Sequence, residues 1–91
     1  MAVLDHRLVL FLPDGAVTGR VAHYTETGLT AVMESEVPRD LRIPFTIHLQ
    51  GRVIGGELTS LGLRDEHVLL QFVSLGESER RRLDRYVVRE E

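Results

Sequence analysis

Apolar and polar residues alternate through most of this chain, and a period of two is typical of β-strands that bury one face. In the run from residue 43 to residue 49, Phe45 and Ile47 alternate with polar neighbours. Apolar runs of this kind, separated by residues that favour turns, predict six strands. The predicted strands are residues 7–12, 17–25, 29–33, 43–49, 53–63 and 67–73.

Proline and glycine add detail to two of these strands. Pro44 has no amide hydrogen, so it restricts the start of its strand to an edge or a bulge. The Gly55-Gly56 pair would suit a bulge or a sharp bend, which small barrels use to close. Between the third and fourth strands, the acidic segment 34–40 is expected to be an exposed loop.

The end of the chain changes period and predicts one helix at about residues 77–89. Gly76 stands at the N-cap position, and Glu77 and Glu79 would face the positive end of the helix dipole. An apolar face follows at i, i+3 and i+4, formed by Leu83, Tyr86 and Val87.

Six short strands in succession, followed by one helix, place the chain in the all-β class. A closed, six-stranded antiparallel β-barrel leaves the fewest unpaired strand edges, so we expect this fold with one C-terminal α-helix. With 91 residues, the chain is long enough for one domain, covering residues 1–91, and too short for two.

The second strand and the turn after it hold the polar side chains that are the main candidates for contact with a ligand. The turn is Glu26-Thr27-Gly28, and we expect Gly28 to supply a positive φ. Strict alternation puts the side chains of the strand on two faces. One face holds Val17, Gly19, Val21, His23 and Thr25, and the other holds Thr18, Arg20, Ala22 and Tyr24.

Composition excludes several classes of protein. There is no cysteine, and the net charge of -3 argues against a binder of nucleic-acid polymers. No apolar run reaches the roughly 20 residues that span a bilayer, so a cytoplasmic location is expected. The four histidines lack metal-ligand spacing, so no metal site is predicted. Carboxylates fall in predicted turns without a converging nucleophile or base, so we expect no enzyme activity.

The order of elements from about Arg7 to Val88 resembles a PilZ domain, the bacterial barrel that binds cyclic di-GMP. The closing stretch is most similar, with Phe72 in the last strand and an arginine-rich helix after it. The resemblance implies a signalling role in motility, pilus, chemosensory or polysaccharide machinery.

The family's ligand motifs are altered in this sequence. The family has Asp/Asn-x-Ser-x-x-Gly after its second strand, where this chain has His23, Thr25 and Gly28. The family also has Arg-x-x-x-Arg ahead of its first strand, where this chain offers only Arg7, with Val3 in place of the other arginine. The resemblance therefore implies a degenerate site of Arg7, His23, Thr25 and Gly28, with cyclic di-GMP as a weak ligand or none.

The predicted helix carries a second candidate site. Arg81, Arg85 and Arg89 follow one another at i, i+4 and i+8 and would form a positive stripe for a protein partner. A solvated face stabilised by pairs such as Glu77 with Arg81 is the structural alternative.

Three functions remain open on the sequence alone. The leading hypothesis is a PilZ-like adaptor that acts through protein contacts, and a homo-oligomer is compatible with it. The second is a cyclic di-GMP receptor that completes its site with arginines from another subunit or partner. The third is a plain small barrel unrelated to signalling, with nucleic-acid binding as one option.

Overall fold

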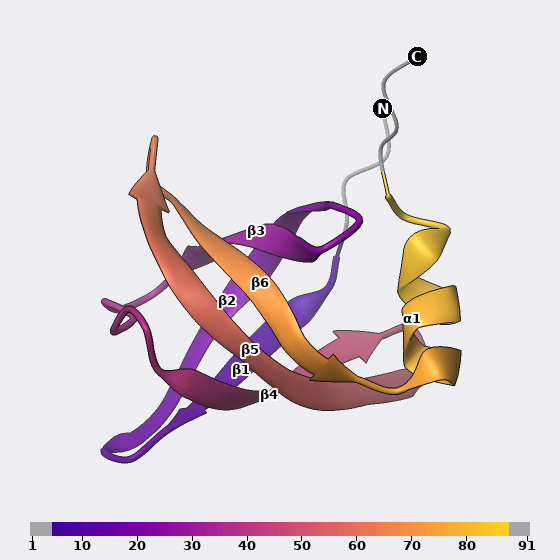
Figure 1. Cartoon of the computed structure of the whole chain (residues 1–91), viewed down its shortest axis with the longest axis horizontal. Coiled ribbons are helices and arrows are strands. Elements are labelled where there is room, and N and C mark those ends of the chain that lie inside the picture. Colours follow the sequence, from indigo (N-terminus) through magenta and orange to yellow (C-terminus); the bar gives the residue numbers. More distant parts are fainter. Residues whose placement is uncertain (1–4, 88–91) are drawn as a thin grey trace.

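The computed structural model describes residues 5–87 and shows a barrel of antiparallel strands with one helix packed at its end (Figure 1). The barrel is closed, in the order β1-β2-β3-β6-β5-β4, which confirms the fold class expected from the sequence. The strands are β1 (Arg7–Leu12), β2 (Gly15–Tyr24), β3 (Gly28–Met33), β4 (Arg42–Leu49), β5 (Arg52–Arg64) and β6 (His67–Leu75), and the helix is α1 (Glu77–Asp84).

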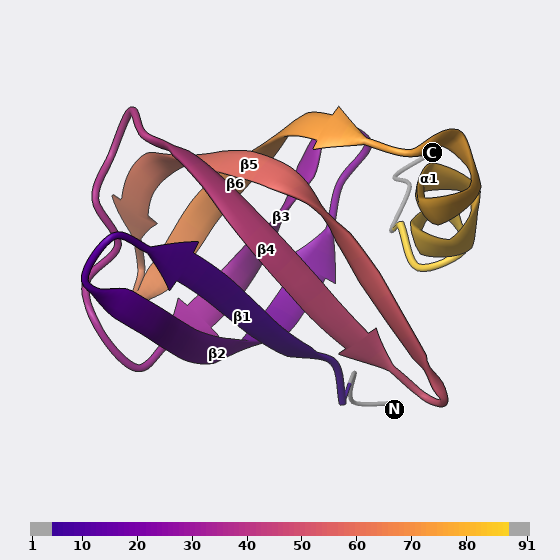
Figure 2. The same ribbon diagram turned by 90° about the horizontal axis from the view of Figure 1, so that it is seen from below.

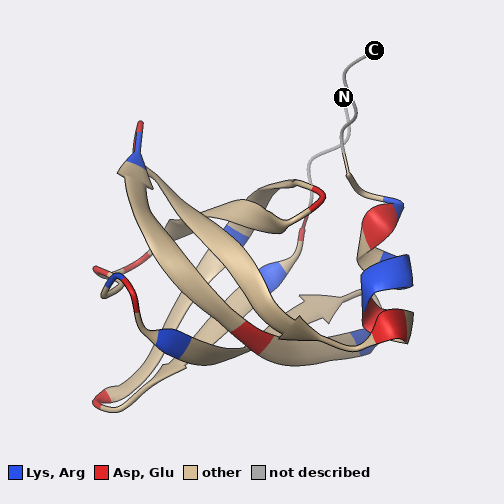
Figure 3. Ribbon diagram, viewed as in Figure 1, with Lys and Arg blue, Asp and Glu red and all other residues tan. Residues whose placement is uncertain are grey.

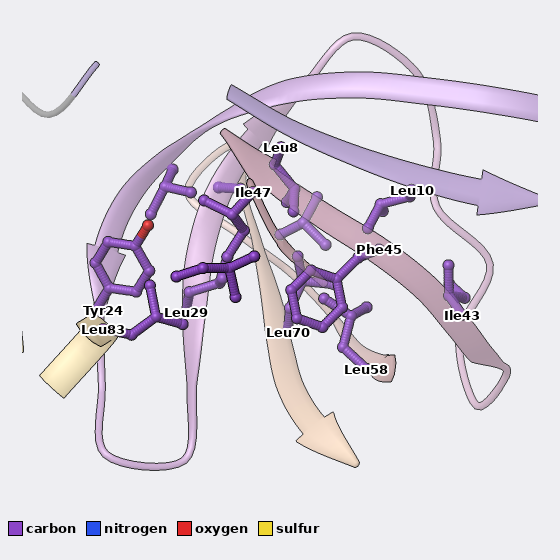
Figure 4. Close-up of a cluster of buried hydrophobic side chains, with 14 residues drawn as sticks. Leu8, Leu10, Tyr24, Leu29, Ile43, Phe45, Ile47, Leu58, Leu70 and Leu83 are labelled. Atoms are coloured by element: carbon purple, nitrogen blue, oxygen red, sulfur yellow. The ribbon is translucent and has the colours of Figure 1, made fainter. Parts of the chain in front are cut away.

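The interior of the barrel is filled by apolar side chains from every strand. Figure 4 shows them meeting between the strands, with Leu83 of α1 closing one end beside Tyr24. Phe45 and Phe72 add a stacked aromatic pair with ring centroids 5.6 Å apart. The buried apolar residues are Leu8, Leu10, Val21, Tyr24, Leu29, Ala31, Ile43, Phe45, Ile47, Ile54, Leu58, Val68, Leu70 and Leu83.

A bulge in β2 overturns the predicted division of its side chains between two faces. The register against β3 shifts between Val21 and His23, and one extra residue reverses the alternation after it. Val21 and Tyr24, predicted on opposite faces, therefore both point inward, and Tyr24 is only 2% exposed. His23 lies outside, on the face opposite to Val21.

The structure also tests the expectations for the Gly55-Gly56 pair and for Pro44. Gly55 and Gly56 pair in unbroken register with Thr46 and Phe45 of β4, so that pair is not bulged. The register shifts between β5 and β6 instead, once between Glu57 and Leu58, where the extra residue is Val73 of β6, and once between Ser60 and Gly62 of β5. Pro44 lies just outside the ladder to β1, which reaches only to Phe45, and this agrees with its missing amide hydrogen.

The helix is shorter than the predicted span of 77–89. It ends at Asp84 with Arg85 as its C-cap, and a turn follows in which the Tyr86 amide donates to the Leu83 carbonyl (2.9 Å). The turn brings Val87 into an isolated bridge with Tyr24. The predicted apolar face is still correct, because Leu83 is buried and Tyr86 and Val87 pack against the core. Figure 2 shows α1 standing at one end of the barrel.

Candidate functional site

Arg7 lies on the outer surface of the barrel, in a polar hollow of about 440 Å³. The strand register places it directly between Arg20 of β2 and His48 of β4. The Arg20 Nη1 atom lies 3.1 Å from Asp5 Oδ1, and both side chains are largely exposed. The hollow is lined by Asp5, Arg7, Thr18, Gly19, Arg20, Glu34 and His48.

The turn between β2 and β3 is held together by Thr25 and Gly28. The Thr25 amide donates to the Gly28 carbonyl (2.8 Å), and the Gly28 amide donates to Thr25 Oγ1 (3.0 Å). The Thr25 hydroxyl therefore already accepts one hydrogen bond within the protein. This turn carries the carboxylate of Glu26 and contains no cationic residue of its own.

Gly28 is needed for a reason other than the predicted one. Its φ is not positive; the glycines with positive φ among the described residues are Gly15, Gly51 and Gly62. A Cβ atom on Gly28 would overlap the Leu70 carbonyl oxygen and approach Gln71 Cα to 2.9 Å. Gly28 thus allows β3 and β6 to lie close together, which any side chain would prevent.

The four predicted ligand residues do not converge on one hollow. His23 is exposed beside the β2 bulge, opposite Thr30, and Thr25 borders a different hollow from Arg7. Arg7 pairs with Arg20, and the five steps along the chain from Arg20 to Thr25 span roughly 15 Å of strand. Only Thr25 and Gly28 are in direct contact.

The hollow that Thr25 borders lies where α1 meets the barrel, and we call it the seam hollow. It has a volume of about 350 Å³, an apolar floor that includes Phe72 and Leu83, and a charged rim. On the rim, Arg80 Nη1 donates to the Glu26 carbonyl (3.4 Å), and Arg81 Nη2 lies 3.2 Å from Glu77 Oε1. The full lining is Thr25, Glu26, Phe72, Leu75, Glu77, Arg80, Arg81, Leu83, Asp84 and Val87.

The arginines predicted to form one stripe face different surroundings. Arg81 borders the seam hollow and is paired with Glu77, as the solvated-face alternative expected. Arg85 borders a smaller hollow of about 180 Å³ with Arg52 and Tyr86. Arg89 lies outside the described residues. Both signs of charge alternate along α1 (Figure 3).

An aromatic cluster under the end of α1 was missed by the sequence reasoning. The buried His6 ring shares a 2.9 Å hydrogen bond between Nδ1 and the Tyr24 hydroxyl, and it meets Tyr86 edge-on at 4.8 Å. Burial lowers the pKa of His6, although the charge of Asp5 opposes this. Burial raises the pKa of Tyr24, as does the neighbouring Tyr86. The available signal was the spacing of His6, Leu8 and Leu10 on one strand face.

Two other features are absent from residues 5–87. No group of three or more His, Cys, Asp or Glu side chains is arranged to hold a metal ion in that part of the chain. None of the helical structure described there is long and apolar enough to cross a membrane. No protein-family model, curated protein or solved structure matches this chain.

Proposed function

We propose that this chain is a PilZ-like adaptor of bacterial cyclic di-GMP-linked regulation that acts in the cytoplasm through protein contacts and does not itself bind the dinucleotide with micromolar affinity. A closed six-stranded barrel with a C-terminal helix supports the proposal, together with the family-like sequence of residues 70–86. Its partners would belong to motility, pilus, chemosensory or polysaccharide machinery.

The observation that carries the proposal is the separation of Arg7 from the Thr25–Gly28 turn. Arg7 and Thr25 border different hollows, which supports the proposal that one ligand is not gripped by both. Each charge-assisted hydrogen bond contributes about 1.5–3 kcal/mol. The loss of one arginine contact therefore weakens binding by a factor of roughly ten to a hundred.

The residues at the turn give little compensation. His23 replaces a carboxylate that could accept both N–H donors of a guanine edge, whereas a neutral imidazole offers one acceptor and a protonated one offers none. The Thr25 hydroxyl already accepts the Gly28 amide. Guanine recognition at this position should accordingly be poor.

One observation favours the second candidate, a cyclic di-GMP receptor. Arg80 and Arg81 border the same hollow as Thr25, so the chain could supply arginines without a second subunit. However, Glu26, Glu77 and Asp84 also line that hollow. Three carboxylates against two guanidinium groups leave a net charge of -1, which disfavours a ligand with two phosphates.

Calorimetric titration with cyclic di-GMP distinguishes the two candidates. If the chain is an adaptor, we expect no saturable heat at a nucleotide concentration of about 100 µM. A micromolar constant that is lost in Arg80→Gln and Arg81→Gln, but kept in the matched control Arg52→Gln, would establish the receptor instead.

Pull-down from a bacterial lysate with Arg81→Glu and Arg85→Glu variants tests whether α1 contacts a partner. Partner loss in either variant assigns the contact to the side of α1 that carries that arginine. If every partner stays bound, the helix arginines are a solvated face.

A further inference from the structure

A large hollow lies at the end of the barrel away from α1, between the 34–40 loop and the β5–β6 turn, and we call it the distal hollow. Figure 1 shows these two segments on the side of the barrel opposite α1. Its volume is about 600 Å³, compared with about 350 Å³ for the seam hollow. Its lining is Met33, Glu34, Ser35, Glu36, Val37, Arg39, Ser60, Gly62, Leu63, Glu66 and Val68.

A buried hydroxyl without a partner lies in the wall of the distal hollow. Ser60 is 1% exposed, and no described residue makes a hydrogen bond with its Oγ atom. Its carbonyl is satisfied by the Asp40 amide at 3.3 Å. A buried hydroxyl without a hydrogen bond lowers stability, so an occupant of the hollow that supplies a donor or acceptor to it would offset that cost.

The same hollow presents apolar surface that the barrel leaves uncovered. Leu63 is 72% exposed, the highest value among the exposed large apolar side chains. Val68 is buried in the wall, and Met33 and Val37 pack partly against the core beside it. An aliphatic group entering the hollow would cover this surface and gain free energy from burial.

The charge of the lining selects a cation. Glu34, Glu36 and Glu66 face a single guanidinium, that of Arg39, which leaves a net charge of -2. Glu34 accepts a hydrogen bond from Thr18 Oγ1 (2.6 Å), whereas Glu36 and Glu66 have no ion pair with a described residue. A positively charged partner would meet unpaired carboxylates here.

Glu66 also occupies a backbone conformation that favours other residues. It has φ of 69° and follows Asp65 with φ of 50°, where turns of this type usually carry asparagine and glycine. A glutamate therefore costs stability at this position, and its carboxylate borders the hollow. Backbone strain that is kept at a surface turn is often associated with a binding role.

We propose that the distal hollow binds a short segment of another protein that presents one aliphatic side chain flanked by basic residues. The aliphatic group contacts Leu63 and Val68, and the basic groups meet Glu36 and Glu66. A Ser60 hydroxyl can donate and accept, which suits a main-chain N–H or C=O and favours a peptide. This inference rests on the proposed adaptor role and names the surface and partner chemistry for it.

The probe is the peptide acetyl-Arg-Arg-Leu-Arg-Arg-amide, followed by NMR of the methyl groups of the full chain. We expect saturable shifts at Met33, Leu63 and Val68, with a dissociation constant at least about tenfold lower than for the same peptide with serine in place of leucine. Methyl groups at the seam hollow, such as those of Leu75 and Leu83, should stay unchanged.

Three variants separate binding from folding. Glu66→Gly removes the carboxylate and relieves the positive φ, so it should weaken the peptide several-fold while leaving the protein equally or more stable. Ser60→Ala should also weaken binding without loss of stability, because the unsatisfied hydroxyl is gone. Glu26→Gln, at the other end of the barrel, is the matched control and should bind like the wild type.

Several results would overturn the proposal. Equal binding of the leucine and serine peptides would mean nonspecific attraction to an acidic protein. Methyl shifts that do not change at millimolar peptide would mean that there is no site. Tighter binding of n-butylammonium would indicate a small-molecule site. Self-association seen by sedimentation, with concentration-dependent shifts of the same methyl groups, would make a second copy of the chain the occupant. Nucleotide binding would refute the adaptor role separately, with the peptide result unaffected.

Discussion

Replacing Gly28 by alanine tests the close approach of β3 to β6, which positions the Thr25 turn. The new Cβ would overlap the Leu70 carbonyl oxygen and lie 2.9 Å from Gln71 Cα. These neighbours are backbone atoms, so no side chain can rotate away and the two strands must separate. Overpacking costs about 1–3 kcal/mol, and a weakened ladder hydrogen bond adds about 1 kcal/mol. We therefore expect a loss of about 2–4 kcal/mol in the free energy of unfolding.

Urea unfolding followed by circular dichroism measures this change, with two comparison variants. Gly51→Ala has open space but φ of 72°, so it should cost only about 1–2 kcal/mol. Gly28→Asn should be at least as damaging as Gly28→Ala, because the space and not a positive φ is limiting. A Gly28→Ala protein within about 0.5 kcal/mol of wild type, or a Gly28→Asn protein more stable than Gly28→Ala, would show that space between β3 and β6 is not what requires this glycine.

Three other outcomes follow from the cluster beneath α1. Tyr24→Phe should lower stability by about 1–3 kcal/mol in urea unfolding, because it leaves the buried His6 nitrogen without its partner; an unchanged midpoint would contradict this. The folded pKa of His6 lies below the ordinary value of 6.5, so the unfolded chain binds the proton more readily and stability should fall as pH drops below about 6.5. His6→Leu should flatten that part of a pH–stability curve, and a curve unaltered by the variant would count against the assignment. Leu83→Ala, at a side chain 3% exposed, should cost about 2–5 kcal/mol, and seam-hollow methyl resonances should broaden as α1 loosens; sharp, unshifted resonances would show that Leu83 does not anchor the helix.

Much of the fold could be predicted from the sequence because the signals were local. Period-two patterning and the turn residues at Pro13–Gly15 and Gln50–Gly51 determine where strands begin and end. Each of the six predicted strands differs from the observed one by three residues or fewer, counted over both of its ends. Closure into a barrel followed from the need to pair edges. These features depend on neighbours in the chain and on general physical constraints.

The errors concern features that depend on tertiary contacts. The β2 bulge between Val21 and His23 is determined by pairing with β3, and it places Tyr24 in the core on the same side as Val21, not on the opposite face as predicted. A glycine beside a turn can be required for a positive φ or for a close approach of two backbones. The sequence favoured the first for Gly28, and only the position of Leu70 shows that the second holds. The helix end was misplaced because the spacing of Leu83, Tyr86 and Val87 fits a helix and also a turn that packs on Tyr24.

The candidate site was least predictable for the same reason. Motif spacing could identify Arg7, Thr25 and Gly28, but it could not give the distance between β1 and the β2–β3 turn. The distal hollow was also beyond the sequence, because Ser60 and Glu66 are brought together with the 34–40 loop only by the fold.

The proposed adaptor role depends on Arg7 and the Thr25–Gly28 turn not holding one dinucleotide together. The most direct measurement is a backbone amide NMR titration of the full chain with cyclic di-GMP. At about 100 µM nucleotide, we expect no saturable shifts of the backbone amides of Arg7, His23, Thr25 or Gly28. Saturable shifts at Arg7 and at Thr25 with one shared micromolar constant would contradict it.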